Sequence, residues 1–177
     1  MITGNFVYLI STLPMLQFGS KPPFSFEKFL QICSRYISNR DIEVLKMSSI
    51  SGEYGKKAPK ISTLKKWRDF DTALRNELVK IRASHRRQDP IKYLRQDGIA
   101  DSFITHIGMN AHRNPSVLEA EKMLDSARWD ALDELKLEHY FDLDFLIVYA
   151  HKLLILERWE RIEAAEESRI LKELVWQ

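Results

Sequence analysis

The spacing of apolar residues predicts that helices make up almost the whole chain. Over residues 62–87, leucine, isoleucine and aromatic residues recur three or four positions apart, which places them on one face of a helix. A similar series runs from residue 114 to about residue 135, with alanines small enough to let another helix approach closely. A third helix is expected over residues 141–174, apolar on nearly every side in its first half and amphipathic in its second. The pattern indicates an all-α helical bundle with a long C-terminal helix.

Capping residues and prolines predict where several helices begin and end. Ser25 and Ser62 each precede an apolar helical stripe and are expected to be N-caps. Asp89 and Asn114 each stand directly before a proline, so an N-cap residue is followed by the residue favoured at the first helical position. Gly108 is expected to end a short helix that begins near residue 99, because glycine adopts the left-handed conformation easily.

The first 24 residues and residues 51–61 do not fit long helices. Three prolines interrupt the N-terminal segment, where alternating Phe6, Tyr8 and Ile10 fit either a short extended stretch or one helical turn. We expect a short irregular or extended N-terminal segment there. Residues 51–61 hold two glycines, a proline and three lysines, so they are expected to form a basic loop. All these elements are expected to belong to one helical domain, residues 1–177.

Cysteine content and hydropathy indicate the cellular compartment. The single cysteine, Cys33, lies in an apolar run, so an internal disulfide is impossible and the thiol is expected to be buried. The longest unbroken apolar run, Phe145–Ala150, is far shorter than the roughly 20 residues of a membrane span. No lysine or arginine precedes Lys21, so the positively charged start of a signal peptide is missing. We therefore expect a cytoplasmic protein.

Charge is distributed unevenly along the chain. Residues 1–97 contain 18 Lys/Arg and 9 Asp/Glu, a net charge of +9, whereas residues 98–177 contain 9 Lys/Arg and 16 Asp/Glu, a net charge of −7. Such polarity can orient a protein within an assembly, since complementary potentials bring partners into register. Mutual attraction of the two halves explains it equally well.

The sequence lacks the common motifs of catalysis, cofactor binding and metal binding. It contains no Glu-x-x-His, His-x-x-x-His or Cys-x-x-Cys, no glycine-rich nucleotide loop and no Gly-x-Ser-x-Gly. We expect no metal, cofactor or small-molecule substrate and no enzymatic activity. The remaining enzyme hypothesis uses His139 with Asp142 or Asp144, although carboxylates there are expected to cap the last helix. His151 and Lys152 interrupt the apolar half of that helix and are expected on its least buried stripe.

Two groups of basic residues are the best candidates for a binding surface. Asp69, Asp71 and Glu77 interrupt them and no recognition-helix pattern is present, so nucleic acid is not the expected partner. A solvated helix face or a protein-binding face fits better. His85 lies within the second group. The candidate partner-binding residues are Lys56, Lys57, Lys60, Lys65, Lys66 and Arg68 in the first group and Arg82, Arg86 and Arg87 in the second.

Three segments together resemble a bacterial protein family. They are YLISTLPML near the start, NPSVLEAEKMLDSARWDALDEL in the middle and HYFDLDFLIVYAHKLLILERW near the end. The resemblance extends from about Phe6 to Trp159. Members of this uncharacterised family are typically encoded among the genes of a V/A-type ATPase, where they take the place of the C-type subunit, known as the d-type in eukaryotes.

The resemblance implies a non-catalytic connecting subunit of a bacterial V/A-type rotary ATPase, a complex that transports protons or sodium ions. The C-type subunit is helical, binds no nucleotide, sits on the cytoplasmic face of the proteolipid ring and receives the central stalk. The implied partners are therefore the central stalk and the proteolipid ring, and the implied location is cytoplasmic with peripheral membrane association through the complex. A helical adaptor or assembly factor for another protein complex is the alternative that the sequence leaves open.

Overall fold

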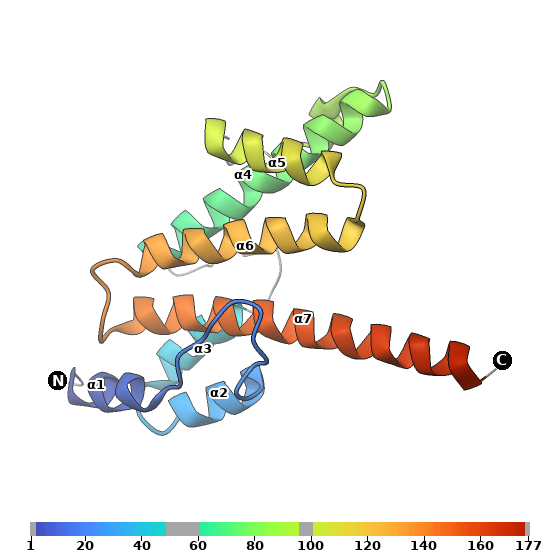
Figure 1. The fold of residues 1–177 in the computed structure, drawn as a ribbon. Helices are drawn as coiled ribbons and strands as arrows, with labels where there is room; N and C mark the ends of the chain where they lie inside the picture. The colour runs from blue at the N-terminus through green and yellow to red at the C-terminus, as the bar shows by residue number, and fades with distance from the viewer. Residues whose placement is uncertain (1–2, 49–60, 96–100, 176–177) are drawn as a thin grey trace. The chain divides into compact units, whose positions relative to one another are not determined.

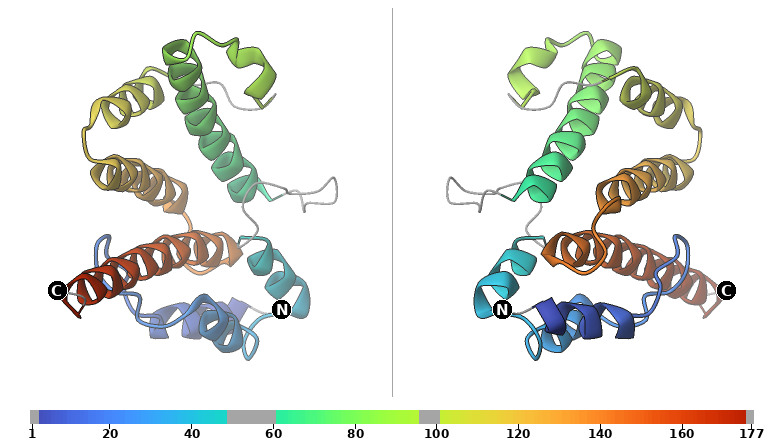
Figure 2. Two further views of the ribbon diagram at one scale, coloured as in Figure 1. Left: turned by 90° about the vertical axis from the view of Figure 1, so that its right-hand side faces the viewer. Right: turned by 90° about the vertical axis from the view of Figure 1, so that its left-hand side faces the viewer.

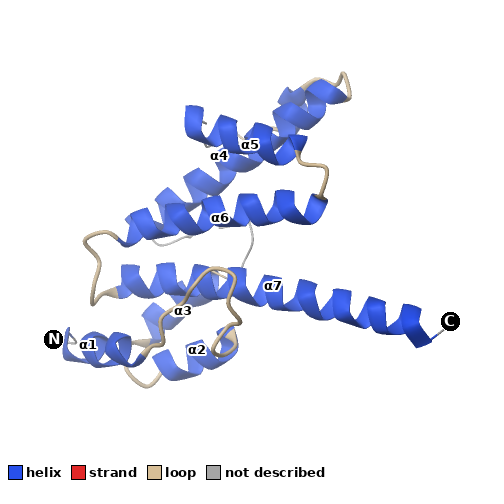
Figure 3. Ribbon diagram, viewed as in Figure 1, coloured by secondary structure: helices blue, strands red, loops and turns tan. Residues whose placement is uncertain are grey.

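The computed structural model describes residues 3–48, 61–95 and 101–175, and all regular structure within these ranges is helical (Figures 1 and 3). This confirms the expected all-α class, and the long C-terminal helix is confirmed with it. The helices are α1 (Thr3–Thr12), α2 (Phe26–Cys33), α3 (Asn39–Met47), α4 (Ser62–His85), the 3-10 helix η1 (Pro90–Tyr93), α5 (Ser102–Arg113), α6 (Val117–Lys136) and α7 (Leu143–Val175).

The helices belong to two compact units. Unit 1 contains α1, α2, α3 and α7, and unit 2 contains α4, η1, α5 and α6. The single domain expected from the sequence stays a prediction. Among the helices that the structure describes, none combines the length and apolar character that a membrane span requires.

An aromatic cluster joins the N-terminal segment of unit 1 to α2 and α7. Tyr149 of α7 stacks on Phe29 of α2 with ring centroids 5.2 Å apart, and Phe24 and Phe145 lie near the same ring. The Tyr149 hydroxyl donates a hydrogen bond of 2.9 Å to the Pro14 carbonyl. The N-terminal segment therefore packs against the helices of unit 1, because a buried tyrosine hydroxyl needs a partner and the proline carbonyl supplies it.

The N-terminal segment itself is partly helical. Of the two alternatives for the residues around Phe6, the helical one is confirmed, since they lie within α1, and the extended one is wrong. Leu9 and Ile10 on this helix are buried, whereas Val7 and Tyr8 are exposed, so one side of α1 packs against the unit. Irregular backbone follows from Leu13 to Ser25, as expected from its prolines.

The start of α2 is fixed by two side chains. The Ser25 hydroxyl accepts the backbone N–H of Lys28 at 3.2 Å, which confirms the predicted N-cap. From α7, Glu157 Oε1 accepts the backbone N–H of Phe26 at 2.7 Å. A carboxylate at a helix N-terminus is stabilising because the unpaired N–H groups there carry partial positive charge. Glu157 thus connects α7 to α2, in place of the ion pair with Arg161 that its position on the helix would favour.

Cys33, at the end of α2, is fully buried, as predicted from the apolar run around it. Burial raises the pKa of its thiol from 9.0 to about 12, because the thiolate is poorly solvated there, and a hydrogen bond from the backbone offsets only part of this effect.

We predict that Cys33 is nearly inert in the native protein. A pKa of about 12 in place of 9.0 lowers the thiolate fraction at pH 8 roughly a thousandfold, and the thiolate is the reactive species. Labelling with iodoacetamide at pH 8 should therefore be slow in buffer and fast in denaturing urea. Equal rates in the two conditions would show that the thiol is accessible in the folded chain.

Unit 2 is built around a small apolar core between α4, α5 and α6. Its buried members are small or medium in size, which lets the three helices lie close together. They are Ala73, Leu74, Ile104, Ala111 and Leu124, with Phe70, Leu78, Ile107 and Ala120 packed against them.

Polar side chains fix the ends of the helices in unit 2, and two of the predicted caps are wrong. The N-cap of α4 is Ile61, which provides no side-chain cap, and Ser62 is the first helical residue. The N-cap of α6 is Ser116, which accepts the N–H of Glu119 at 3.3 Å. Asn114 instead accepts the N–H of Ser116 in a turn that precedes the helix. The predicted Asp89 cap is confirmed, and the helix that it opens is η1.

The segment after η1 is attached to α4 by one buried side chain. Asn76 donates to the carbonyl of Arg95 at 2.9 Å and accepts the N–H of Arg95 at 3.0 Å. The amide therefore satisfies both backbone groups of a residue outside regular structure. Figure 2 shows η1 beside the C-terminal part of α4, where this attachment holds it.

Gly108 does not end a helix, which corrects the prediction from the sequence. It lies inside α5 and is buried. A Cβ atom at this position would lie 3.2 Å from Ile81 Cδ1 and 3.3 Å from Glu77 Cγ, closer than side chains normally pack. The glycine is therefore explained by the close approach of α4 rather than by the left-handed conformation.

We predict that Gly108→Val lowers the free energy of unfolding by about 2 kcal/mol, because the larger side chain forces α4 and α5 apart. Gly108→Ala should change it by less than about 1 kcal/mol, since the gain in helix propensity offsets the tighter contact. Urea unfolding followed by circular dichroism measures both. Thr105→Val, at an exposed position of the same helix, is the matched control and should be nearly neutral. A Gly108→Val protein as stable as the control would contradict the close contact.

Candidate protein-binding surfaces

The structure separates the two predicted basic groups rather than joining them. Lys65 and Lys66 are exposed and Arg68 is half-buried in the first turns of α4. Arg82 is in its last turn, about 25 Å away along the helix axis. The other exposed members of the second group are Arg86 and Arg87, whereas Lys56, Lys57 and Lys60 lie outside the described residues.

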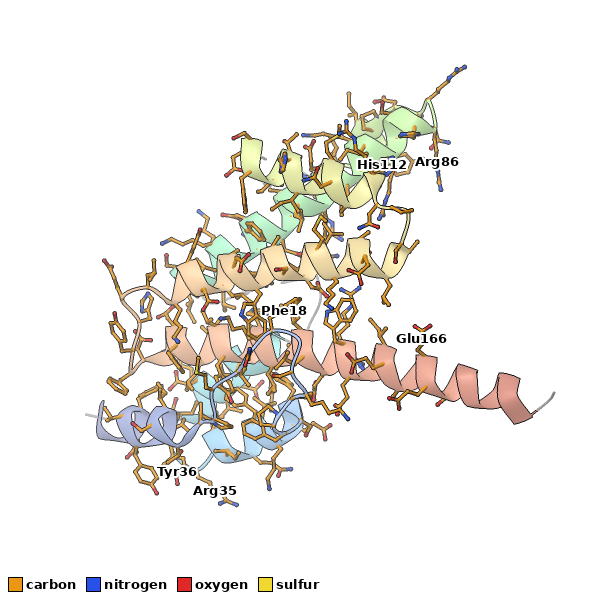
Figure 4. All side chains as sticks on the ribbon, in the orientation of Figure 1. Phe18, Arg35, Tyr36, Arg86, His112 and Glu166 are labelled. Atoms are coloured by element: carbon orange, nitrogen blue, oxygen red, sulfur yellow. The ribbon has the colours of Figure 1, made fainter. Side chains whose placement is uncertain are left out.

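The second group is enlarged by residues from α5. The rings of His85 and His112 are in contact, with centroids 4.5 Å apart. Gly108 lies against Ile81 four residues earlier on each helix, so α4 and α5 run in the same direction. Their C-termini therefore lie together, and Figure 4 labels Arg86 and His112 at this shared end. We call this surface the basic end; it consists of Arg82, His85, Arg86, Arg87, His112 and Arg113, all exposed.

Part of this positive charge has a structural explanation. The last carbonyl groups of a helix carry partial negative charge, which basic residues in the last turn stabilise. Two such helix ends meet here. Within the described ranges, however, no carboxylate forms an ion pair with any residue of the basic end. The surface consequently keeps an excess of positive charge.

The C-terminus of α4 contains a strained residue. Arg87 has φ of +51°, the left-handed conformation that glycine adopts most easily. Its N–H bonds to the Ser84 carbonyl at 3.1 Å, and the N–H of Gln88 bonds to the Ala83 carbonyl at 3.0 Å. These two bonds form the helix-ending motif in which glycine is the usual residue at this position. An arginine is found there instead, at a cost of about 1 kcal/mol.

Exposed apolar residues stand beside the basic end in the chain. Ile91 and Tyr93 of η1 are 74% and 59% exposed, and Val117, the first residue of α6, is 78% exposed. Arginine and aromatic residues together are typical of protein interfaces.

Sequence reasoning found only the α4 part of the basic end. His112 and Arg113 end α5 just as His85 and Arg86 end α4, but this similarity becomes informative only once the two helices are known to run in parallel.

A second candidate surface is the C-terminal half of α7. Every side chain of residues 160–168 except that of Ile162 is exposed, and four of these residues are glutamates. We call residues 160–168 the α7 extension; Figures 1 and 2 show it reaching beyond the helices of unit 1 that cover the first half of α7. A helical segment whose side chains are nearly all exposed has no core of its own to hold it, so it commonly bridges to another body.

A cluster of three titratable residues lies at the N-terminus of α7: His139, Asp142 and Asp144. Asp142 Oδ1 accepts the N–H of Phe145 at 2.9 Å, and its Oδ2 lies 2.6 Å from His139 Nδ1. The hydrogen bond to Asp142 raises the pKa of His139, opposed by slight burial and assisted by the charges of Asp142, Asp144 and Glu138. One potential ligand atom from each of the three residues lies within 4.8 Å of the others, so they could hold a metal ion. The predicted capping role of Asp142 is confirmed.

His151 and Lys152 occupy a different position from the one predicted. Both are buried in α7, at 5% and 7% exposure, rather than on its least buried stripe. The apolar half of α7 is therefore covered even where polar residues interrupt it.

A buried ion-pair network between α4 and α6 is structural. Arg128 of α6 donates to Asp71 of α4 at 3.0 Å and to Asp125 at 2.7 Å, and Asp71 also accepts from Arg75 at 2.7 Å. Burial alone would lower the pKa of Arg128, but the two carboxylates outweigh it and raise that pKa. The charges of the network compensate one another, so it leaves no net attraction for a partner.

We predict that Arg128→Met destabilises unit 2 by about 3 kcal/mol or more, because Asp71 and Asp125 would remain as buried like charges without their shared cation. Arg75→Met, which removes a more exposed partner of the same Asp71, should cost less than about 1 kcal/mol. Thermal unfolding of the two variants provides the measurement. Equal losses of stability in the two variants would mean that the burial of Arg128 does not increase the cost of removing its charge.

The fold and surfaces define an α-helical chain with two exposed charged surfaces of opposite sign. Residues 102–177, which span α5, α6 and α7, match the family described as "Protein of unknown function (DUF2764)". The match covers less than half of the chain. No curated protein and no solved structure matches it.

Proposed function

We propose that this chain is a non-catalytic connecting subunit of a bacterial V/A-type rotary ATPase, located on the cytoplasmic side and linking the central stalk to the membrane proteolipid ring. The family resemblance of three segments of the sequence motivates the choice of complex. The observation that carries the binding role is the α7 extension, a stretch of helix continuous with a packed core yet exposed on nearly every side.

A connecting subunit must be stiff and must bind at two places. The 33-residue α7 supplies stiffness, since a continuous helix held along its first half by α2 and α3 resists bending. Its exposed half, if isolated, would be near the limit of stability in water, because helices shorter than about 12–15 residues are marginal alone. A partner that packs on the α7 extension would stabilise it. The basic end of unit 2 supplies a second, oppositely charged contact surface.

The proposal predicts that tagged full-length protein, purified from its native host at low salt, recovers catalytic, stalk and proteolipid subunits of the ATPase. The double variant Glu163→Lys, Glu167→Lys should recover at least about fivefold less of one of these subunits, since charge complementarity selects partners. Mass spectrometry of the recovered proteins is the readout.

The matched control is Glu27→Lys, Glu43→Lys, which reverses two exposed glutamates on other helices of unit 1. It should recover the same proteins as the wild type. Absence of all ATPase subunits from the wild-type sample, with those subunits detectable in the input, rejects the connecting-subunit proposal. Recovery of a different complex would support the adaptor alternative.

A further inference from the structure

We propose that the basic end of unit 2 is the docking site for an acidic amphipathic α-helix of a partner protein. The inference rests on the proposed function in one respect: the partner helix would belong to another subunit of the ATPase. It concerns a surface made by α4 and α5 and does not depend on the α7 extension.

The positive charge of the basic end indicates that the partner surface is negatively charged. Four arginines and two histidines converge where α4 and α5 end, without a carboxylate paired to any of them in the described part of the chain. Guanidinium groups bind carboxylates in a bidentate geometry and lose little hydration in doing so. An acidic surface is therefore the complementary one.

The neighbouring apolar residues indicate that the partner is amphipathic. Ile91 and Tyr93 follow α4 on η1, and Asn76 holds the end of this segment against α4. Val117 follows Arg113 after a short turn. These side chains are largely exposed and lie within a few residues of the arginines along the chain. A helix with glutamates on one face and leucines on the next would offer contacts to both kinds of residue.

The conformation of Arg87 argues that this surface is used. Glycine would end α4 with less strain, and a strained residue persists where the surroundings or the function require it. Arg87 adds a cation to the surface at a position where helix termination alone would favour glycine. Substitution by glycine should therefore separate stability from binding.

The test uses the full-length protein and a fluorescent helical peptide with glutamates on one face and leucines on the other. Fluorescence anisotropy at low and at high salt gives the affinity, and a peptide with lysines in place of the glutamates is the control ligand. We expect the acidic peptide to bind at least about threefold more tightly at low salt than at high salt, because salt screens exposed charges. The basic peptide should not bind measurably.

Three variants locate the site. Arg86→Glu with Arg87→Glu should weaken binding about tenfold or more, whereas Lys21→Glu with Lys28→Glu, at exposed lysines of unit 1, should leave it within about twofold. Arg87→Gly should weaken binding about threefold while leaving the melting temperature unchanged or higher.

Each contrary result has one meaning. Equal losses in the two charge-reversal variants, or no binding by wild type, would overturn the docking site. Peptide binding without recovery of ATPase subunits from the host would reject the proposed complex and leave the docking site standing.

Discussion

The close approach of α4 and α5 at Gly108 is the constraint on which unit 2 depends. Without a Cβ atom, the backbone of α5 can lie against Ile81 and Glu77, and the two helices then run side by side in the same direction. The same register brings His85 against His112 four residues further on. One missing methyl group in the core thus determines which side chains meet at the surface, because packed helices cannot shift without losing their contacts.

Charged residues in this chain divide into those that hold helices together and those that face outward. Arg128 bridges Asp71 and Asp125, and Glu157 accepts the first N–H of α2, so each of these charges is compensated where it is buried. The arginines at the end of α4 form no ion pair with a carboxylate in the described ranges, and the glutamates of the α7 extension are exposed. Unit 2 therefore carries an exposed basic surface and unit 1 an exposed acidic one.

Local sequence signals predicted most of the fold, and failed at some helix boundaries and where tertiary contacts decide. Ser25 and Asp89 are caps as predicted. Ser62 and Asn114 are not, because α4 begins one residue earlier than predicted and Ser116 caps α6 in place of Asn114. The local pattern around Gly108 allows a helix end, whereas the reason for this glycine lies on another helix. The α4 part of the basic end could be predicted from its arginines. The contribution of α5 could not, because the parallel arrangement of two helices joined by a crossover leaves no periodic signal in the chain.

The distinction between local and tertiary causes also explains why Arg87 is stronger evidence for a binding surface than the other basic residues are. A basic residue near a helix C-terminus is stabilising through the helix dipole, so Arg82, Arg86 and Arg113 do not by themselves indicate a partner. Arg87 lies one position further, where the left-handed backbone disfavours any side chain. Arg87 places a cation at this position although the backbone conformation is unfavourable for a side chain. It also lies two residues after His85, which meets His112 only in the folded chain. Conformational strain and charge thus point to the same surface from independent physical causes.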